Sequence, residues 1–226
     1  MLHEVQQKIL TKLTELFPGQ IDLSKHIPEP YWNYAKGVNK VKAIYLGCDP
    51  TNTVKNVQFE YAFAHGTSDP GFKRFITLHE KQLKSIGLIW DDVYTQNLCQ
   101  NYFTSETTKN KVWKRAAREI WIQELNNELD CLFGKDIPVL LTSQLLLDVL
   151  LNDDMLETGK RPALYDAMKF YSGETIIPIT SDQNKLRRPL IPVYRGRNPQ
   201  TGKSYMLSND IHHEYVNRIK QILNPN

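Results

Sequence analysis

Apolar residues recur along the chain in two alternating patterns, one typical of buried strands and the other of amphipathic helices. Largely apolar runs of the strand type occupy residues 41–46, 137–143 and 190–193. Apolar residues at helical spacing predict helices over 2–17, 72–86, 112–133, 144–151 and 211–223. Because strands alternate with helices, we predict an α/β fold with a parallel sheet and helices on both of its faces.

A further apolar stretch, residues 175–179, predicts a short additional strand. Pro178 has no N–H to donate to a neighbouring strand, so this strand is expected at an edge. A chain of 226 residues suits one large domain that buries well over half of its unfolded surface. We therefore expect a single domain over 1–226, in which an N-terminal helix and a Pro-rich link (1–39) precede the core (40–226).

The composition is ordinary for a globular domain, with 41% hydrophobic and 23% charged residues. No apolar run approaches the ~20 residues of a membrane-spanning helix, and the first residues do not resemble a signal peptide. The three cysteines are odd in number and lack the paired spacing of a metal site, which favours a reducing compartment. We expect a cytoplasmic monomer that needs no metal or other cofactor.

Basic residues are concentrated near the last predicted strand, although the net charge is only +3. A window with no acidic residue after Asp182 contains Lys185, Arg187, Arg188, Arg195, Arg197 and Lys203. Such windows are usually solvated loops. This window extends on both sides of the fourth predicted strand, beside the candidate site described next. It therefore indicates a surface that binds nucleic acid.

The segment 41–66 contains the most informative chemistry of the chain. Its apolar run stops at Gly47, and the carboxylate of Asp49 follows at once, held by Pro50. Ligands of open α/β sheets bind beyond the carboxyl ends of the strands, so Asp49 is placed where chemistry usually occurs. It could act as a general base or stabilise a developing cation. The alternative is an ordinary turn Asp that accepts hydrogen bonds from nearby backbone amides.

Two further residues could bind a planar ligand. Phe63, in a second apolar patch, could stack on a nucleobase, although core packing would explain it equally well. Asn97 could pair with an amide-like base edge through its carbonyl and amide groups. A strand-end Asn that satisfies a turn is the alternative of nearly equal weight.

Together these motifs resemble the uracil-DNA glycosylase superfamily, over about residues 40–222. The segment Gly47-Cys48-Asp49-Pro50 is similar to its first motif, and Phe63 matches the aromatic residue that stacks on the target base. The runs 93–98, 137–143 and 190–193 resemble its later strands, of which the second ends in a base-reading Asn. The resemblance implies an α/β fold, a three-layer sandwich with a central four-stranded, mainly parallel sheet. It also implies a hydrolase that removes uracil or a related damaged base from DNA.

The resemblance also implies a role for each matching residue. Asp49 would orient water and stabilise an oxocarbenium-like sugar, and Arg195 would supply positive charge to the leaving base or hold a phosphate. The base would lie among Gly47, Pro50, Thr51, Phe63 and Asn97. The DNA backbone would contact Arg187, Arg188, Arg197 and Lys203.

Two departures from the family pattern leave other functions open. No histidine follows the fourth strand, where many members have one, so the chain could bind nucleic acid or a nucleotide without cleaving it. Thr51 replaces a bulky Tyr of the best-known branch, so we expect 5-substituted uracils to be admitted unless another aromatic residue, such as Tyr61 or Tyr94, fills the gap. A more distant alternative is a hydrolase with Cys48 as nucleophile and His65 as its base.

Overall fold

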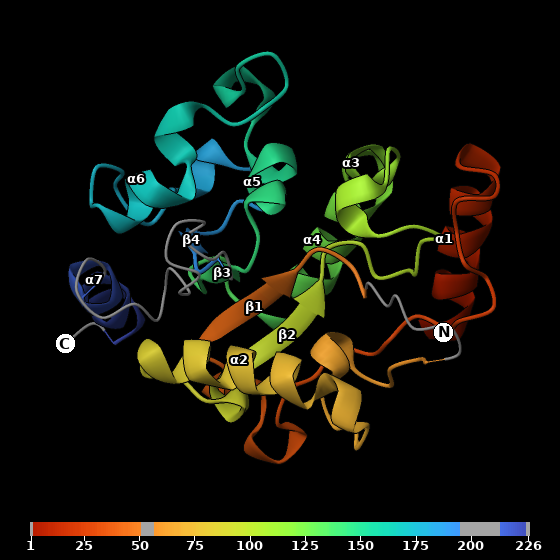
Figure 1. Ribbon diagram of the computed structural model, residues 1–226, viewed down its shortest axis with the longest axis horizontal. Helices are drawn as coiled ribbons and strands as arrows, with labels where there is room; N and C mark the ends of the chain where they lie inside the picture. Colours follow the sequence, from red (N-terminus) through yellow and green to blue (C-terminus); the bar gives the residue numbers. More distant parts are fainter. Residues whose placement is uncertain (1, 51–56, 195–212, 225–226) are drawn as a thin grey trace.

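Four short strands form the centre of the molecule. In the computed structural model, which describes residues 2–50, 57–194 and 213–224, they are β1 (Ala43–Gly47), β2 (Val93–Asn97), β3 (Val139–Leu141) and β4 (Leu190–Pro192). The strands are all parallel and lie in the order β2-β1-β3-β4 (Figure 1). Every strand residue is buried, as expected for a parallel sheet covered on both faces. The predicted four-stranded sheet is confirmed, and all of it is parallel.

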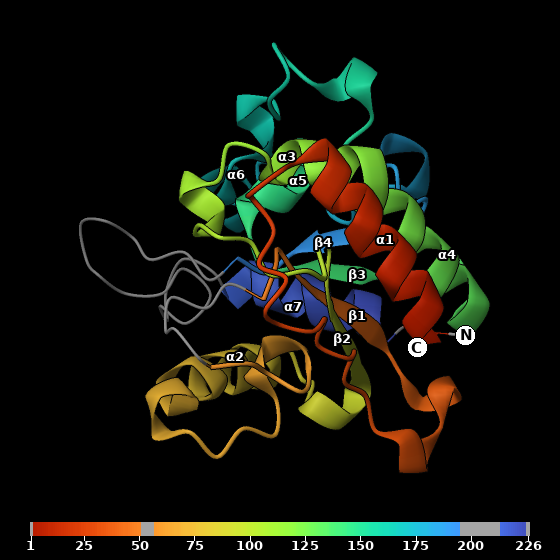
Figure 2. The ribbon, with the colours of Figure 1, turned by 90° about the vertical axis from the view of Figure 1, so that its right-hand side faces the viewer.

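Helices connect the strands and flank both faces of the sheet. They are α1 (Leu2–Leu16), α2 (Lys73–Ser85), α3 (Trp113–Ala116), α4 (Ile122–Leu132), α5 (Gln144–Leu150), α6 (Ala167–Tyr171) and α7 (His213–Leu223). Figure 2 shows α2 and α7 on one side of the sheet and α1 and α4 on the other. The molecule is thus an α/β fold consistent with a three-layer sandwich. The predicted start of the last helix, residues 211 and 212, lies outside the described residues.

The long helix predicted over 112–133 is present, but its hydrogen bonding changes along its length. A π-helical turn, Ala117–Trp121, joins α3 to α4 without breaking the helical path. Trp113 and Trp121 are both fully buried on this helix and anchor it to the core. A π turn inserts an extra residue into the helix, which alters the faces that its two halves present to the sheet.

The additional strand predicted over 175–179 is wrong. Only Ile179 pairs with the sheet, through a single antiparallel bridge to Leu190 on β4. Pro178 cannot donate a backbone hydrogen bond, and the side chain of Ile176 is 82% exposed. The segment therefore contacts the outer edge of β4 at one residue and does not extend the sheet.

The N-terminal segment packs closely on the core. Leu13 of α1 and Phe17, which follows the helix, are buried in the same apolar cluster as the strands. The link after α1 runs along the outer edge of β2, where Tyr31 exchanges two backbone hydrogen bonds with Thr95. Among the described residues, no helix is both long and apolar enough to cross a membrane.

Candidate functional site

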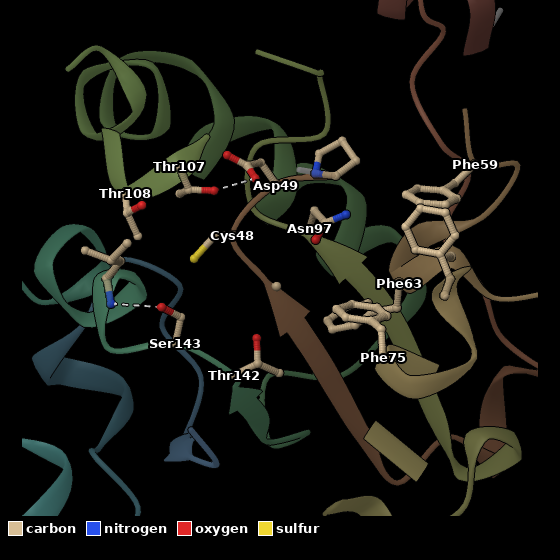
Figure 3. A pocket seen from close by; sticks show the side chains of 15 residues that line it. Cys48, Asp49, Phe59, Phe63, Phe75, Asn97, Thr107, Thr108, Thr142 and Ser143 are labelled. Atoms are coloured by element: carbon tan, nitrogen blue, oxygen red, sulfur yellow. Dashed lines mark hydrogen bonds between the residues drawn. The ribbon is translucent and has the colours of Figure 1, made fainter. Parts of the chain in front are cut away.

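A pocket of about 190 Å³ lies at the carboxyl ends of β1, β2 and β3 (Figure 3). This is the edge at which open α/β sheets bind their ligands. Asp49, Phe63 and Asn97 all line it, together with Gly47 and Pro50. The prediction that residues 48 positions apart would share one pocket is therefore confirmed. The pocket is smaller than the roughly 300–1,000 Å³ of sites for drug-sized ligands, so it suits a small molecule or a single base.

Asp49 lies just after the carboxyl end of β1 and is held there by a side chain from a distant part of the sequence. Its Oδ1 atom accepts a hydrogen bond of 2.7 Å from the hydroxyl of Thr107. Thr107 belongs to the short helical turn Thr107–Lys109, which lies between β2 and α3. The hydrogen bond fixes the plane of the carboxylate relative to the pocket, which a base or an electrostatic stabiliser requires.

Asn97 lies directly beside Gly47, because the parallel register of β1 and β2 pairs these two residues. Among the described residues no hydrogen bond engages the side-chain amide of Asn97, which lines the pocket and is 5% exposed. A Cβ atom on Gly47 would lie 2.3 Å from Asn97 Oδ1 and 2.9 Å from Phe63 Cζ. Only glycine at position 47 therefore leaves room for the amide and the ring where they stand.

Aromatic rings form one side of the pocket. The rings of Phe63 and Phe75 are stacked, with centroids 6.5 Å apart and an interplanar angle of 27°. Phe63 and Ala64 adopt left-handed backbone angles, with φ of 59° and 54°. Non-glycine residues rarely adopt such angles, and two in succession must be imposed by the surrounding packing. They direct the Phe63 ring toward the pocket.

A second pair of rings, Phe59 and Phe72, lines the pocket in a separate apolar cluster. Their centroids are 4.7 Å apart and their planes are perpendicular. The backbone N–H of Phe59 donates to the hydroxyl of Tyr102 at 3.0 Å, which fixes this wall in place. The pocket is therefore bounded by two independent aromatic groups, of which sequence reasoning found only the one that contains Phe63.

Hydroxyl groups form the opposite side of the pocket (Figure 3). The hydroxyl of Thr142 donates to the Leu46 carbonyl at 2.8 Å, and the Ser143 hydroxyl accepts from the backbone N–H of Leu145 at 3.3 Å. Ser143 caps α5, so its oxygen is occupied as an acceptor while its O–H can still donate. The sequence signal for these residues was their position at the end of the third predicted strand.

A buried polar network supports Asn97 from behind. The side-chain carbonyl of Gln96 accepts a hydrogen bond of 2.9 Å from the backbone N–H of Asn97. The side-chain amide of Gln96 donates a hydrogen bond of 3.0 Å to the carboxylate of Glu128 on α4. The same carboxylate accepts hydrogen bonds from the hydroxyl of Tyr94 at 2.6 Å and from the side-chain amide of Gln100 at 2.8 Å. Burial and the nearby carboxylate raise the pKa of Tyr94, so its hydroxyl remains a donor. Fully satisfied networks of this kind rigidify their surroundings, here the end of β2.

The two tyrosines considered as space-filling groups lie elsewhere. Tyr61 packs edge-on against Tyr31, with ring centroids 5.8 Å apart, and Tyr94 points toward Glu128. Neither residue is part of the pocket lining. Thr51, whose small side chain was expected to leave space in the pocket, lies outside the described residues.

The part of the basic window that precedes β4 does not adjoin the pocket. Arg187 and Arg188 lie ahead of the first residue of β4, at the amino edge of the sheet, whereas the pocket lies at the carboxyl edge. Arg188 is 0% exposed, and its guanidinium binds Asp130 at 2.8 Å and the backbone carbonyls of Phe133 and Gly134. The prediction that Arg188 contacts DNA is wrong, because a buried and ion-paired guanidinium cannot reach a phosphate.

Arg188 should instead stabilise the fold. Replacing it with Ala should lower the free energy of unfolding by about 1–3 kcal/mol, since two carbonyls and a carboxylate lose their donors. Arg187, its exposed neighbour, provides the matched control, and Arg187→Ala should change stability by less than about 0.5 kcal/mol. Urea unfolding of both variants tests this. Equal stability of the two would show that the buried contacts of Arg188 contribute nothing.

The remaining predicted cations, Arg195, Arg197 and Lys203, lie outside the described residues. Among the described residues that line the pocket there is no Lys, Arg or His. Lys185, the first member of the basic window, forms an ion pair of 2.7 Å with Asp153.

The position of His65 does not support the nucleophilic-cysteine alternative. Cys48 lines the pocket, but His65 does not; its ring stacks on Tyr31 with centroids 3.4 Å apart. Burial lowers the pKa of His65 despite the attraction of Asp91. Cys99 follows the end of β2 and is fully buried, which raises the pKa of its thiol. Across the described part of the chain, no cluster of three or more His, Cys, Asp or Glu residues could hold a metal ion.

Comparison with protein-family models, with curated proteins and with solved structures finds no match for this chain. The structure thus defines the molecule by its own geometry: an α/β protein with a small, partly aromatic pocket at the carboxyl edge of a parallel sheet.

Proposed function

We propose that this protein is a DNA glycosylase, which hydrolyses the N-glycosidic bond of uracil or a related damaged base. The observation that carries the proposal is the convergence of a carboxylate, an amide and an aromatic ring on one small pocket. Asp49, Asn97 and Phe63 come from three separate segments, yet all line a cavity of about 190 Å³. Enzymes that act on a base must extrude it from the duplex into such a pocket.

Recognition of the base is assigned to Asn97 and Phe63. The carbonyl of Asn97 would accept the N3–H of uracil while its amide donates to O4, and Phe63 would cover the ring face. Stacking of a base on an aromatic side chain typically contributes about 1–3 kcal/mol. The register that places Asn97 beside Gly47 keeps the amide directed at the base.

Catalysis is assigned to Asp49. In the proposed step the bond between C1′ and the base nitrogen breaks, and both electrons leave with the base. Water adds its oxygen to C1′ and transfers its proton to Asp49, whose negative charge also stabilises the cationic sugar in the transition state. Thr107 keeps the carboxylate oriented through its 2.7 Å hydrogen bond. Arg195 remains the expected source of positive charge for the leaving base.

One observation favours a second candidate, a protein of this fold that binds a base without cleaving it. The described residues of the pocket lining provide no cation to stabilise the departing base. Such a protein would retain recognition by Asn97 and Phe63 and would lack turnover.

Incubation with a uracil-containing oligonucleotide separates the two candidates. Strand breaks at uracil after alkali treatment would reveal abasic sites and support the glycosylase. Tight, uracil-dependent binding without such breaks would support the silent binder. If the protein neither cleaves nor distinguishes uracil from cytosine, both candidates fail.

The range of bases is a further prediction of this proposal. Because neither Tyr61 nor Tyr94 lines the pocket, excision should extend to 5-substituted uracils such as 5-hydroxymethyluracil. A single methyl group in an apolar pocket typically changes discrimination by only about 1–3 kcal/mol. Single-turnover rates for uracil and its 5-substituted analogues measure this directly. Thr51→Tyr should narrow the range toward uracil, and strict uracil preference in the unchanged protein would contradict the prediction.

A further inference from the structure

A second cavity, of about 390 Å³, lies between the end of α1 and the beginning of α3. Phe17 and Pro18 line one side of it, and Lys109, Lys111 and Arg115 line the other. We call this cavity the basic groove. Figure 2 shows the end of α1 beside α3, and the guanidinium of Arg115 lies 5.2 Å from the centre of the Phe17 ring.

The described lining of the groove contains three cations and no Asp or Glu. One of them, Arg115, is paired with Glu119 at 2.6 Å, so binding of a phosphate falls to Lys109 and Lys111. Lys109 pairs with Glu106 at 2.9 Å, but the two side chains are 74% and 39% exposed. Exposed pairs of this kind contribute little, about 0–1 kcal/mol, so Lys109 can exchange its partner for a phosphate at small cost. Lys111 forms no ion pair in the part of the chain that the structure describes.

Neighbouring residues of one segment line the pocket and the basic groove. Thr107 and Thr108 line the pocket, and Lys109 and Lys111 follow them in the chain and line the groove. Consecutive Cα atoms are about 3.8 Å apart, so the backbone of Lys111 lies within about 11 Å of that of Thr108. A strand of DNA rises about 3.4 Å per nucleotide, so the lysines are within reach of the first few phosphates beside a base held in the pocket.

We propose that the basic groove binds the phosphodiester backbone of the DNA strand whose base enters the pocket. The proposal rests on the proposed function. It replaces the surface predicted from the basic window ahead of β4, because Arg187 and Arg188 lie at the other edge of the sheet. Lys109 and Lys111 neutralise phosphates at the pocket mouth and so draw the flanking strand toward Asp49.

The test is the salt dependence of oligonucleotide binding by the full chain. Each phosphate contact contributes about 0.7–0.9 to the slope of log affinity against log salt. The double variant Lys109→Ala/Lys111→Ala should therefore reduce that slope by about 1.4–1.8. A matched double variant, Lys42→Ala/Arg187→Ala, removes the same charge from the amino edge of the sheet and should leave the slope unchanged.

The outcomes separate this proposal from the proposed function. An unchanged slope in Lys109→Ala/Lys111→Ala, or an equal reduction in both double variants, overturns the groove assignment even if the unchanged protein excises uracil. A reduced slope in the groove variant alone supports the groove. That result stands even if no abasic sites form, in which case the glycosylase proposal fails and the groove does not. Both lysines are exposed on the surface, and a denaturant melt of each variant verifies that folding is intact.

Discussion

Asp49→Asn should reduce the single-turnover rate of uracil excision by about 10²–10⁴-fold, the usual contribution of a positioned acid or base. The amide has nearly the shape of the carboxylate and can still accept the hydrogen bond from Thr107. It can neither take the proton of the attacking water nor balance a cationic sugar. Affinity for the uracil-containing strand should therefore persist while cleavage is lost. Rapid mixing with excess protein measures the cleavage rate, and fluorescence anisotropy measures the affinity.

Thr107→Val supplies the graded comparison. It leaves the charge of Asp49 in place and removes the 2.7 Å hydrogen bond that orients it. A single hydrogen bond has a net value of about 0.5–1.5 kcal/mol, so the rate should fall only about 2–13-fold. An Asp49→Asn variant that cleaves as fast as the unchanged protein would remove Asp49 from the mechanism. A Thr107→Val variant as slow as Asp49→Asn would make orientation, and not charge, the dominant requirement.

Two strands could be predicted from their composition, because strands that are buried on both faces appear as apolar runs. Val139–Leu141 lies within the run 137–143, and Ala43–Gly47 overlaps the run 41–46. Val93–Asn97 is also buried, but it contains three polar residues, so its prediction depended on the family resemblance. The positions of the strands relative to Gly and to intervening helical patterns were enough to indicate a parallel sheet. The π turn Ala117–Trp121 could not be predicted, since the spacing of apolar residues does not distinguish it from the α-helical segments on either side.

The site could be predicted in part for a topological reason. Asp49 follows β1 and Asn97 ends β2, and the carboxyl ends of neighbouring parallel strands converge on one edge of a sheet. Thr107, by contrast, lies in a loop with no motif, and only the folded chain shows that its hydroxyl reaches Asp49. The supporting carboxylate Glu128 appeared in the sequence as one more polar residue of a long helix.

Arg188 shows where charge in a sequence misleads. A run of basic residues has the same composition whether its side chains lie on the surface or not. The neighbouring Arg187 is exposed, while Arg188 points inward to the end of α4, where carbonyls and Asp130 bind it. Arg188 is buried because its hydrogen-bond partners lie more than 50 positions away in the sequence. Local patterning cannot contain that information.

Gly47→Ala should impair base recognition more than any other change of one methyl group. The new Cβ would stand 2.3 Å from Asn97 Oδ1 and 2.9 Å from Phe63 Cζ, so the amide and the ring must both move. A bidentate contact to a base is worth about 1–3 kcal/mol, and base stacking about 1–3 kcal/mol. Losing a substantial part of both should weaken binding of a uracil-containing strand by about 10²–10³-fold. The measurement uses the Asp49→Asn background, in which cleavage does not interfere.

A double-mutant cycle shows whether the loss arises at Asn97. If the methyl group introduced by Gly47→Ala already displaces the amide, Asn97→Ala should weaken binding in the Gly47 protein and have almost no further effect in Gly47→Ala. The coupling free energy between the two positions should then approach the whole effect of Asn97→Ala, about 1–3 kcal/mol. Additive effects would mean that the amide does not read the base from its place beside Gly47. Because alanine suits a strand better than glycine, Gly47→Ala should stay folded, and its denaturant midpoint distinguishes a blocked pocket from a damaged sheet.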